Sequence, residues 1–161
     1  MSNKRLWELF NPDFENGVLF RKNSQGGVPI GGVAGYLTNR NYYKVKVDGK
    51  SLFTHRVLYA MYHGIALDKC PNIDHIDRDS TNNKITNLRA CVQSDNCANR
   101  GVFSSSKSGF KGVSVKGNGK FEAYCVKYGK RYYLGVYDTP GEAHNAYLNK
   151  AREVHGDYCY E

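Results

Sequence analysis

Asp74 and His75 are neighbours in a segment, residues 72–100, that mixes Asp, Asn and His with regularly placed Ile, Leu and Val. A carboxylate beside an imidazole suits the metal-assisted hydrolysis of a phosphodiester. The carboxylate supplies the hard oxygen that Mg²⁺ prefers, and an imidazole can take a proton from water near neutral pH. Because an Asp-His pair also occurs by chance in many proteins, the residues around it must decide whether it forms a site.

The residues around the pair predict a hairpin that would hold it. Ile73 and Asp74 point to opposite faces of a short strand, and His75 ends that strand. Residues 77–84, "DRDSTNNK", are rich in turn-forming side chains. Residues 85–92, "ITNLRACV", return as a second strand. The pair is therefore expected on a small antiparallel hairpin with a polar loop.

A helix is expected after this hairpin, with Ser94 as its N-cap. Packed across the two strands, the helix would bring Asn96 close to Asp74 and complete a metal site with few protein ligands. Mg²⁺ suits such a site because it keeps several waters and binds substrate phosphate. If the ion binds elsewhere, Asp77 and Asp79 are the alternative carboxylates.

Strands and then one helix are expected before the segment. The alternation of Tyr, Lys and Val in residues 42–48 indicates a strand, and Asp48-Gly49 marks a hairpin turn. From Thr54, the expected N-cap, the period becomes helical, and Gly64 is the expected stop. The apolar face of this helix carries Val57, Leu58, Met61 and Tyr62.

The second half of the chain predicts a separate small module. Residues 101–109, "GVFSSSKSG", read as a flexible linker. Residues 110–137 predict three strands with turns at Asn118-Gly119 and Gly129-Lys130. The helix that follows has Pro140 in its first turn and Gly156 at its stop.

The predicted fold class is α+β, in two domains joined by the linker. Residues 1–100 form the first domain, with a β-rich part over residues 1–53, a helix over residues 54–63 and the polar hairpin and helix over residues 70–100. Residues 110–161 form the second domain. A chain of 161 residues is long enough for two small domains of this size.

The charge of the chain favours a polyanionic partner. The formal net charge is +8, and the isoelectric point is about 9.2. Both halves are basic, so the positive field is not confined to a tail. With 13 Tyr and 7 Phe available for stacking or packing, nucleic acid is a better prediction than an acidic membrane surface. The alternative is an ordinary basic protein with no such partner.

No apolar run near residue 1 indicates a signal peptide, and no stretch approaches the roughly 20 apolar residues of a membrane span. We therefore expect a cytoplasmic protein without membrane contact. The five cysteines form no Cys-x-x-Cys pair and are expected to be reduced thiols. A structural zinc held by Cys91, Cys97 and a nearby His is the alternative.

The motif "DHIDRDSTNNKITNLR…QSDNCANRG" resembles the HNH homing-type endonucleases of bacteriophages, whose core is the ββα-metal (His-Me finger) fold. The resemblance implies that His75 is the general base and that Asn87 pins the loop and orients His75. It also implies that Asp74 and Asn96 hold a divalent metal, Mg²⁺ or Mn²⁺. Arg89 would touch a phosphate. His55 occupies a similar family position but is expected to be a structural histidine.

Residues 108–158 are similar to the AP2 DNA-binding domain, through Gly112-Val113, the turn before Phe121 and the segment "LGVYDTPGEAHNAY". In that domain a three-stranded sheet lies in the major groove and a helix backs it. The resemblance implies an outer sheet face that contacts double-stranded DNA. The residues expected to make these contacts are Lys111, Ser114, Lys116, Lys120, Tyr124, Arg131 and Tyr133.

This face departs from the pattern of the plant relatives, which present several arginines and tryptophans. Here those places hold Ser114, Asn118, Val126 and Tyr133. Bidentate reading of guanine by arginine is therefore weakened. The sequence as a whole predicts a monomeric, metal-dependent DNA endonuclease that nicks one strand. The alternative is a DNA-binding protein whose nuclease core survives only as a fold.

Overall fold

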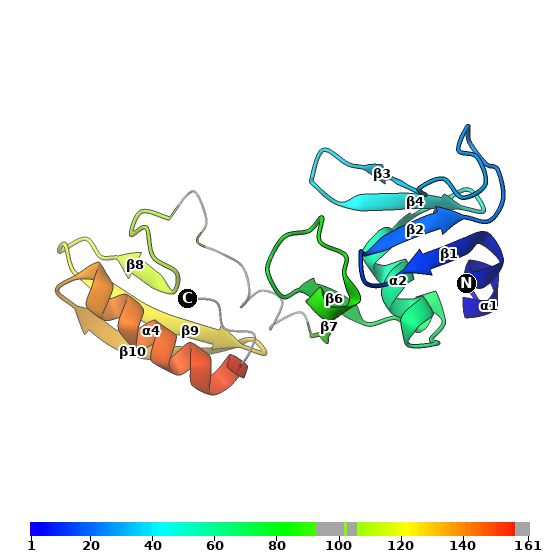
Figure 1. Ribbon diagram of the computed structural model, residues 1–161. Coiled ribbons are helices and arrows are strands. Elements are labelled where there is room, and N and C mark those ends of the chain that lie inside the picture. The colour runs from blue at the N-terminus through cyan, green and yellow to red at the C-terminus, as the bar shows by residue number, and fades with distance from the viewer. Residues whose placement is uncertain (93–101, 103–105, 157–161) are drawn as a thin grey trace. The chain divides into compact units, whose positions relative to one another are not determined.

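The computed structural model describes residues 1–92, 102 and 106–156 of the chain (Figure 1). The chain divides into two compact units, Met1–Cys91 and Val92–Glu161. The described residues form small antiparallel sheets and three α-helices, which agrees with a mixed α+β class. The helix expected from Ser94, and with it Asn96, lies outside the described residues, so the ββα arrangement stays a prediction.

The first unit contains three small antiparallel sheets and the helices α1 and α2. The strand orders are β1-β2, β3-β4-β5 and β6-β7. In chain order the elements are α1 (Asn3–Leu9), β1 (Phe10–Asp13), β2 (Val18–Arg21), β3 (Tyr36–Leu37), β4 (Tyr43–Val47), β5 (Lys50–Phe53), α2 (Thr54–Tyr62), the 3₁₀ turn η1 (Leu67–Lys69), β6 (Asn72–His75), the 3₁₀ turn η2 (Ile85–Asn87) and β7 (Leu88–Cys91).

Helix α1 was not expected from the sequence, because seven residues are too few to show a helical period. The Ser2 side chain caps its first turn by accepting a bond from the Arg5 amide. Leu6 is fully buried in the core of the unit, together with Phe10 just after the helix. Asn3 donates to the Ala60 carbonyl at 2.6 Å and so ties α1 to the end of α2.

Helix α2 differs from its prediction in its N-cap and in one residue of its apolar face. The N-cap is Phe53, and Thr54 is already the first helical residue; its side chain makes no capping bond. Val57, Leu58 and Met61 are buried as expected. Tyr62 is 55% exposed, because the core position falls instead on Ala60, which is fully buried.

The β4–β5 and β9–β10 hairpins each turn through a pair of residues with positive φ. Asp48 and Gly49 have φ values of 47° and 77° and connect β4 to β5, which confirms the predicted turn. The turn predicted at Gly129-Lys130 lies one residue earlier, at Tyr128 (φ 50°) and Gly129 (φ 75°). Two-residue hairpin loops favour this conformation because its twist matches that of the strands.

The second unit is one antiparallel sheet backed by one helix. The strands β8 (Val113–Val115), β9 (Phe121–Lys127) and β10 (Lys130–Tyr137) have the order β10-β9-β8. Helix α4 (Pro140–His155) begins with a capping box between Thr139 and Glu142 and ends at Gly156. Alternation along β9 places Ala123 and Cys125 in the two small cores against α4.

Gly112 lies close to helix α4 in the second unit. A Cβ atom at this position would lie 2.0 Å from the Tyr147 ring of α4, and the φ of Gly112 is 71°. Tyr147 is 5% exposed and packs against Cys125 and Ala151. A glycine is therefore required at residue 112 by both its backbone conformation and its contact with the helix.

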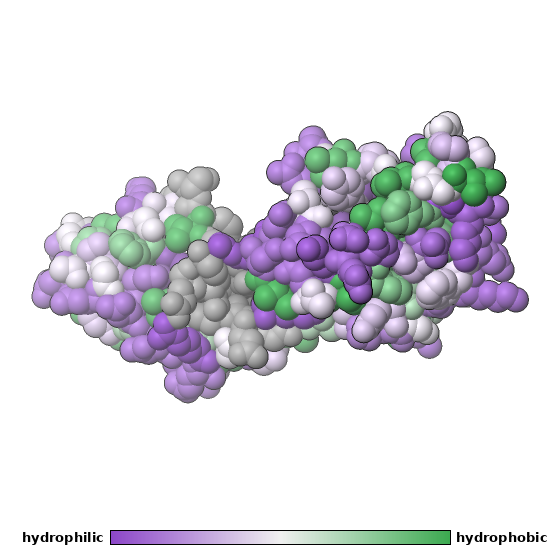
Figure 2. All heavy atoms as spheres, in the orientation of Figure 1, coloured by the Kyte–Doolittle hydropathy of each residue, from purple (hydrophilic) through white to green (hydrophobic). Residues whose placement is uncertain are grey.

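Hydrophilic residues cover most of the visible surface, and apolar residues gather at the β2–β3 loop of the first unit (Figure 2). There Ile30 is 71% exposed and Val33 is 58% exposed. Among the described residues, no helix has the length and apolar character needed to span a bilayer.

Candidate active site on the β6–β7 hairpin

The β6–β7 hairpin carries Asp74 and His75 into a buried position. Asp74 pairs with Arg89 across the two strands, and His75 pairs with Leu88. Asp74 and His75 are each only 6% exposed, and Ile73 on the same strand is 8% exposed. Both faces of the strand are thus covered from Ile73 onward. Ile73 and Asp74 point to opposite faces, but neither face is exposed to solvent. Two buried polar groups need specific partners, and the hairpin supplies them.

The partner of Asp74 is Arg89. The Nε and Nη2 atoms of Arg89 donate to Oδ2 of Asp74 at 3.0 Å and 2.9 Å. The two side chains face each other from opposite strands, with 7% exposure for Asp74 and 16% for Arg89. The phosphate contact expected of Arg89 stays a prediction, and in the structure Arg89 bonds to the carboxylate that is expected to bind metal. Arg89 therefore fixes the position of Asp74.

The partner of the His75 ring is Asn83. The Nε2 atom of His75 lies 3.1 Å from Oδ1 of Asn83, and Asn83 is 3% exposed. An amide oxygen only accepts hydrogen bonds, so Nε2 of His75 carries the hydrogen in this contact. The Nδ1 atom then holds the basic lone pair of the neutral ring. The sequence placed Asn83 in a turn and gave it no role at His75.

Asn87 holds the loop that precedes it. Its Nδ2 atom donates to Oδ1 of Asp77 at 2.9 Å and to the Asn82 carbonyl at 2.8 Å, and its Oδ1 atom accepts from the Asp77 amide at 3.0 Å. These bonds fasten both ends of the loop formed by residues 77–84. Among the described residues, the ring of His75 bonds to Asn83 and not to Asn87, so any effect of Asn87 on the ring passes through this loop.

The two loop carboxylates are committed to local hydrogen bonds. Burial alone would raise the pKa of Asp77, but bonds from Asn82, Asn87 and the Asp79 amide together hold this pKa below its ordinary value. Bonds from the Thr81 side chain and amide lower the pKa of Asp79. Both side chains act as acceptors that shape the loop.

His55 forms one wall of the site, which its sequence position at the helix start did not reveal. Its ring meets that of His75 edge to face, with centroids 4.9 Å apart. Phe53 stacks on the same His55 ring at 5.4 Å. Burial, the nearby His75 and Arg56 lower the pKa of His55 to about 3. His55 is therefore neutral at physiological pH and adds no charge beside His75.

Residues 52–98 match the family model described as HNH endonuclease. The matched segment includes His55, the Asp74-His75 pair, Asn83 and Asn87. A protein of Acanthamoeba polyphaga mimivirus, named as an uncharacterised HNH endonuclease, is 29% identical over 120 residues. The alignment covers 73% of this chain and 60% of the viral protein, so the chain spans less than two thirds of that relative. No solved structure matches the chain.

The oxygen ligands expected of an HNH segment fit a hard divalent cation. Asp74 is a buried carboxylate that Arg89 holds in place, and Asn96 would add an amide oxygen from outside the described residues. Among the residues that the structure describes, no group of three or more His, Cys, Asp and Glu side chains is arranged to hold a metal ion.

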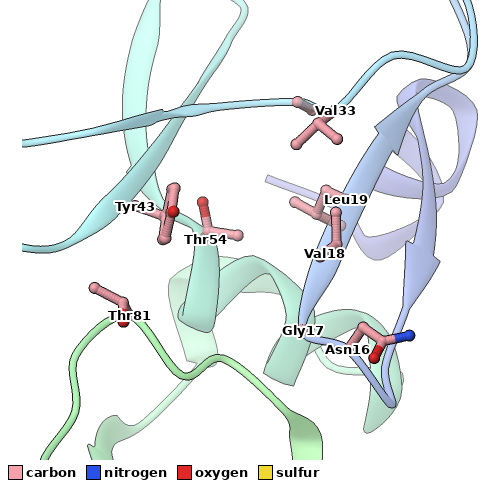
Figure 3. Close-up of a pocket in the computed structure, with 9 residues that line it drawn as sticks. Asn16, Gly17, Val18, Leu19, Val33, Tyr43, Thr54 and Thr81 are labelled. Carbon is pink, nitrogen blue, oxygen red and sulfur yellow. The ribbon is translucent and has the colours of Figure 1, made fainter.

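A pocket of about 240 Å³ borders the 77–84 loop (Figure 3). Asn16 and Gly17 border it from the β1–β2 turn, Thr81 from the loop and Thr54 from the start of α2. The Thr54 hydroxyl is buried without a hydrogen-bond partner among the described residues. Thus the N-terminal hairpin and the 77–84 loop are neighbours in space.

In the second unit, four of the seven expected DNA-contact residues share the face of the sheet opposite α4. The register pairs Tyr124 with Tyr133 and places Arg131 on the same side. The Arg131 guanidinium lies 4.1 Å from the centre of the Tyr124 ring. Glu122, which the sequence did not single out, lies 3.9 Å from Arg131. The four are Ser114, Tyr124, Arg131 and Tyr133.

The three remaining residues lie outside the strands. Lys111 precedes β8, and its backbone carbonyl lies 3.0 Å from Nδ1 of His144 on α4. Lys116 and Lys120 lie in the exposed turn between β8 and β9. Lys120 pairs with Asp138 at 2.9 Å, and both partners are well exposed. Exposed pairs of this kind contribute little to stability, so the lysine can exchange Asp138 for another anion.

Proposed function

We propose that the chain is a divalent-metal-dependent DNA endonuclease in which His75 is the general base. One observation carries this proposal: the buried His75 ring is held through Nε2 by Asn83, and His75 directly follows the buried Asp74 in strand β6. That arrangement leaves Nδ1 as the basic nitrogen, which can accept the proton of an attacking water. The match of residues 52–98 to HNH endonucleases supports the same reaction.

Each residue of the site has a distinct part in the proposed reaction. Nδ1 of His75 takes a proton from water, and Asn83 keeps the ring in the required orientation and tautomer. Asp74 and Asn96 would hold the cation, and Arg89 fixes Asp74. When bound, a divalent cation stabilises the negative charge that develops on the phosphate and on the leaving oxygen. His55 stays neutral and packs against His75 without competing for its proton.

Supercoiled plasmid DNA tests this function directly. We expect nicked circles when the protein is incubated with Mg²⁺ or Mn²⁺, and intact supercoils when EDTA is present. Nicks should precede linear molecules, because one His75 in a monomer cuts one strand per encounter. A DNA-binding protein without catalysis is the second candidate function. It would shift the plasmid on a gel but leave it supercoiled with either ion.

We further propose that residues 110–161 form an AP2-like DNA-binding domain tethered through residues 101–109. Its sheet backed by one helix and the exposed Lys116, Arg131 and Tyr133 support this assignment. Lysine and arginine would contact phosphates, which position a protein on DNA without reading its sequence. The pairing of Arg131 with Glu122 and Tyr124 reduces its freedom to read a base. Tight sequence preference from this face is not expected.

Truncation after residue 103 should separate binding from cleavage. Residues 1–91 enclose their own core, so the shortened chain is expected to fold and to cleave. It should bind DNA more weakly, and its affinity should fall less steeply with salt, because fewer phosphates are neutralised. Fluorescence anisotropy at several salt concentrations measures both quantities. An unchanged affinity and salt slope would contradict the role of the second unit.

A further inference from the structure

The turn between β1 and β2 lies directly against the backbone of Asn83. A Cβ atom on Gly17 would lie 2.3 Å from the carbonyl carbon of Asn83 and 2.5 Å from the Lys84 nitrogen. The φ of Gly17 is +70°, which side chains other than glycine rarely adopt. Two residues further on, the Ile85 amide donates to the Phe14 carbonyl at 3.0 Å. The turn thus packs on the backbone of the residues that end the loop.

Asn83 links this turn to the His75 ring. Its backbone contacts Gly17, whereas its side chain bonds to Nε2 of His75, and the whole residue is 3% exposed. Because the atoms facing Gly17 are backbone, they cannot move away by a change of rotamer. A displacement of the Asn83 backbone must therefore move Oδ1 relative to the ring that it orients.

The other side of the loop is held by the same N-terminal region. The Ser80 hydroxyl donates to the Asn41 carbonyl at 2.6 Å, in the segment between β3 and β4. Asn41 and Gly17 both precede residue 52, where the match to HNH endonucleases begins. In Figure 3 the loop that carries Thr81 runs below the N-terminal strands, with Thr81 and Gly17 on the border of one pocket.

We propose that Gly17 is a positioning residue for His75, acting through Asn83. The inference rests on the proposed function, since it assumes that His75 is the base. Because Gly17 has no side chain, the β1–β2 turn packs directly on the Asn83 backbone. This contact fixes the position of Asn83 Oδ1 relative to the imidazole. The N-terminal hairpin then positions the general base, and it does so through the backbone and side chain of Asn83.

The substitution Gly17→Ala in the full-length protein tests the proposal. We expect kcat for plasmid nicking to fall by about 100-fold, the scale of a misplacement near 1 Å, with KM and the Mg²⁺ requirement unchanged. Gly49→Ala is the matched control. Gly49 has a similar φ of +77°, but a Cβ there would meet no atom within 4 Å. The control should show the same backbone strain and near-normal kcat.

Nitrogen NMR of the His75 ring supplies a second readout that needs no catalysis. In the wild-type protein the signals should report hydrogen on Nε2, and Gly17→Ala should move or broaden them whereas Gly49→Ala should not. If Gly17→Ala matches its control in both kcat and ring signals, the proposal is overturned. A wild-type protein that never nicks DNA would contradict the proposed function, while the ring signals would still decide the role of Gly17.

Asn83→Ala provides an independent test if Gly17→Ala does not fold. It removes the link to the imidazole and leaves the turn intact. We expect a loss of kcat similar to that of Gly17→Ala, again with little change in KM. Wild-type cleavage by Asn83→Ala would show that the turn does not act through this residue and would overturn the proposal.

Discussion

Replacing His75 with alanine is expected to slow DNA cleavage by about 10²–10⁴-fold, the usual cost of removing a general base. The reason is chemical, because water then loses the Nδ1 atom that accepts its proton. Affinity for DNA should stay close to that of the wild-type protein, since the buried ring is not positioned to supply binding energy. Single-turnover nicking at saturating protein measures the rate without interference from product release.

A histidine elsewhere in the chain provides the control for this experiment. His63 at the end of α2 is exposed, and His63→Ala should cleave normally. The loss of His75 also leaves Asn83 without its partner, so thermal unfolding of the variant must be followed alongside the rate. A folded His75→Ala protein with the wild-type rate would show that another group accepts the proton.

The second large effect is expected from Asp74→Asn, which should raise the Mg²⁺ concentration for half-maximal nicking. The substitution keeps the shape of the side chain but removes the charge that attracts a cation. We expect this Mg²⁺ concentration to rise by at least about 10–100-fold. That is the usual loss of metal affinity when a residue that hydrogen-bonds to a metal ligand is replaced. A titration of nicking against Mg²⁺ concentration gives this value directly.

Variants of neighbouring residues show whether Asp74 is the specific ligand. Arg89→Gln removes the two bonds to Oδ2 but leaves the carboxylate, so its shift should be smaller than that of Asp74→Asn. Asp77→Asn and Asp79→Asn should leave the titration near that of the wild-type protein, because both carboxylates already accept local hydrogen bonds. If Asp77→Asn or Asp79→Asn changes the Mg²⁺ concentration for half-maximal nicking and Asp74→Asn does not, the cation binds at the 77–84 loop.

Local signals in the sequence predicted local structure well. Asp48-Gly49 marked a hairpin because few residue pairs accept positive φ twice, and Pro140 and Gly156 bounded α4 for equally local reasons. Helix α1 was not predicted, because its stability comes from contacts with α2 rather than from its own seven residues. The shift of the N-cap to Phe53 has the same origin, since Thr54 is buried in the unit.

The chemistry of the site was visible in the sequence, but its geometry was not. Asp74 and His75 stand next to each other, so their types and spacing already suggested hydrolysis. The partners Asn83 and His55 could not be assigned, because the contact of Asn83 with His75 depends on the path of the 77–84 loop and that of His55 depends on how β6 packs against α2. Gly17 gave even less signal, as a glycine in a turn is ordinary until its neighbour is known.

The contact between Gly17 and Asn83 has a consequence for the time at which activity appears. Early and late parts of the first unit must meet before the imidazole is held, and such distant contacts form slowly during folding. A chain emerging from the ribosome exposes the β1–β2 hairpin long before residue 83 is made. Nascent chains are therefore expected to bind DNA weakly and leave it uncut, and nuclease activity should begin only after the hairpin of Asp74 and His75 has been released and docked.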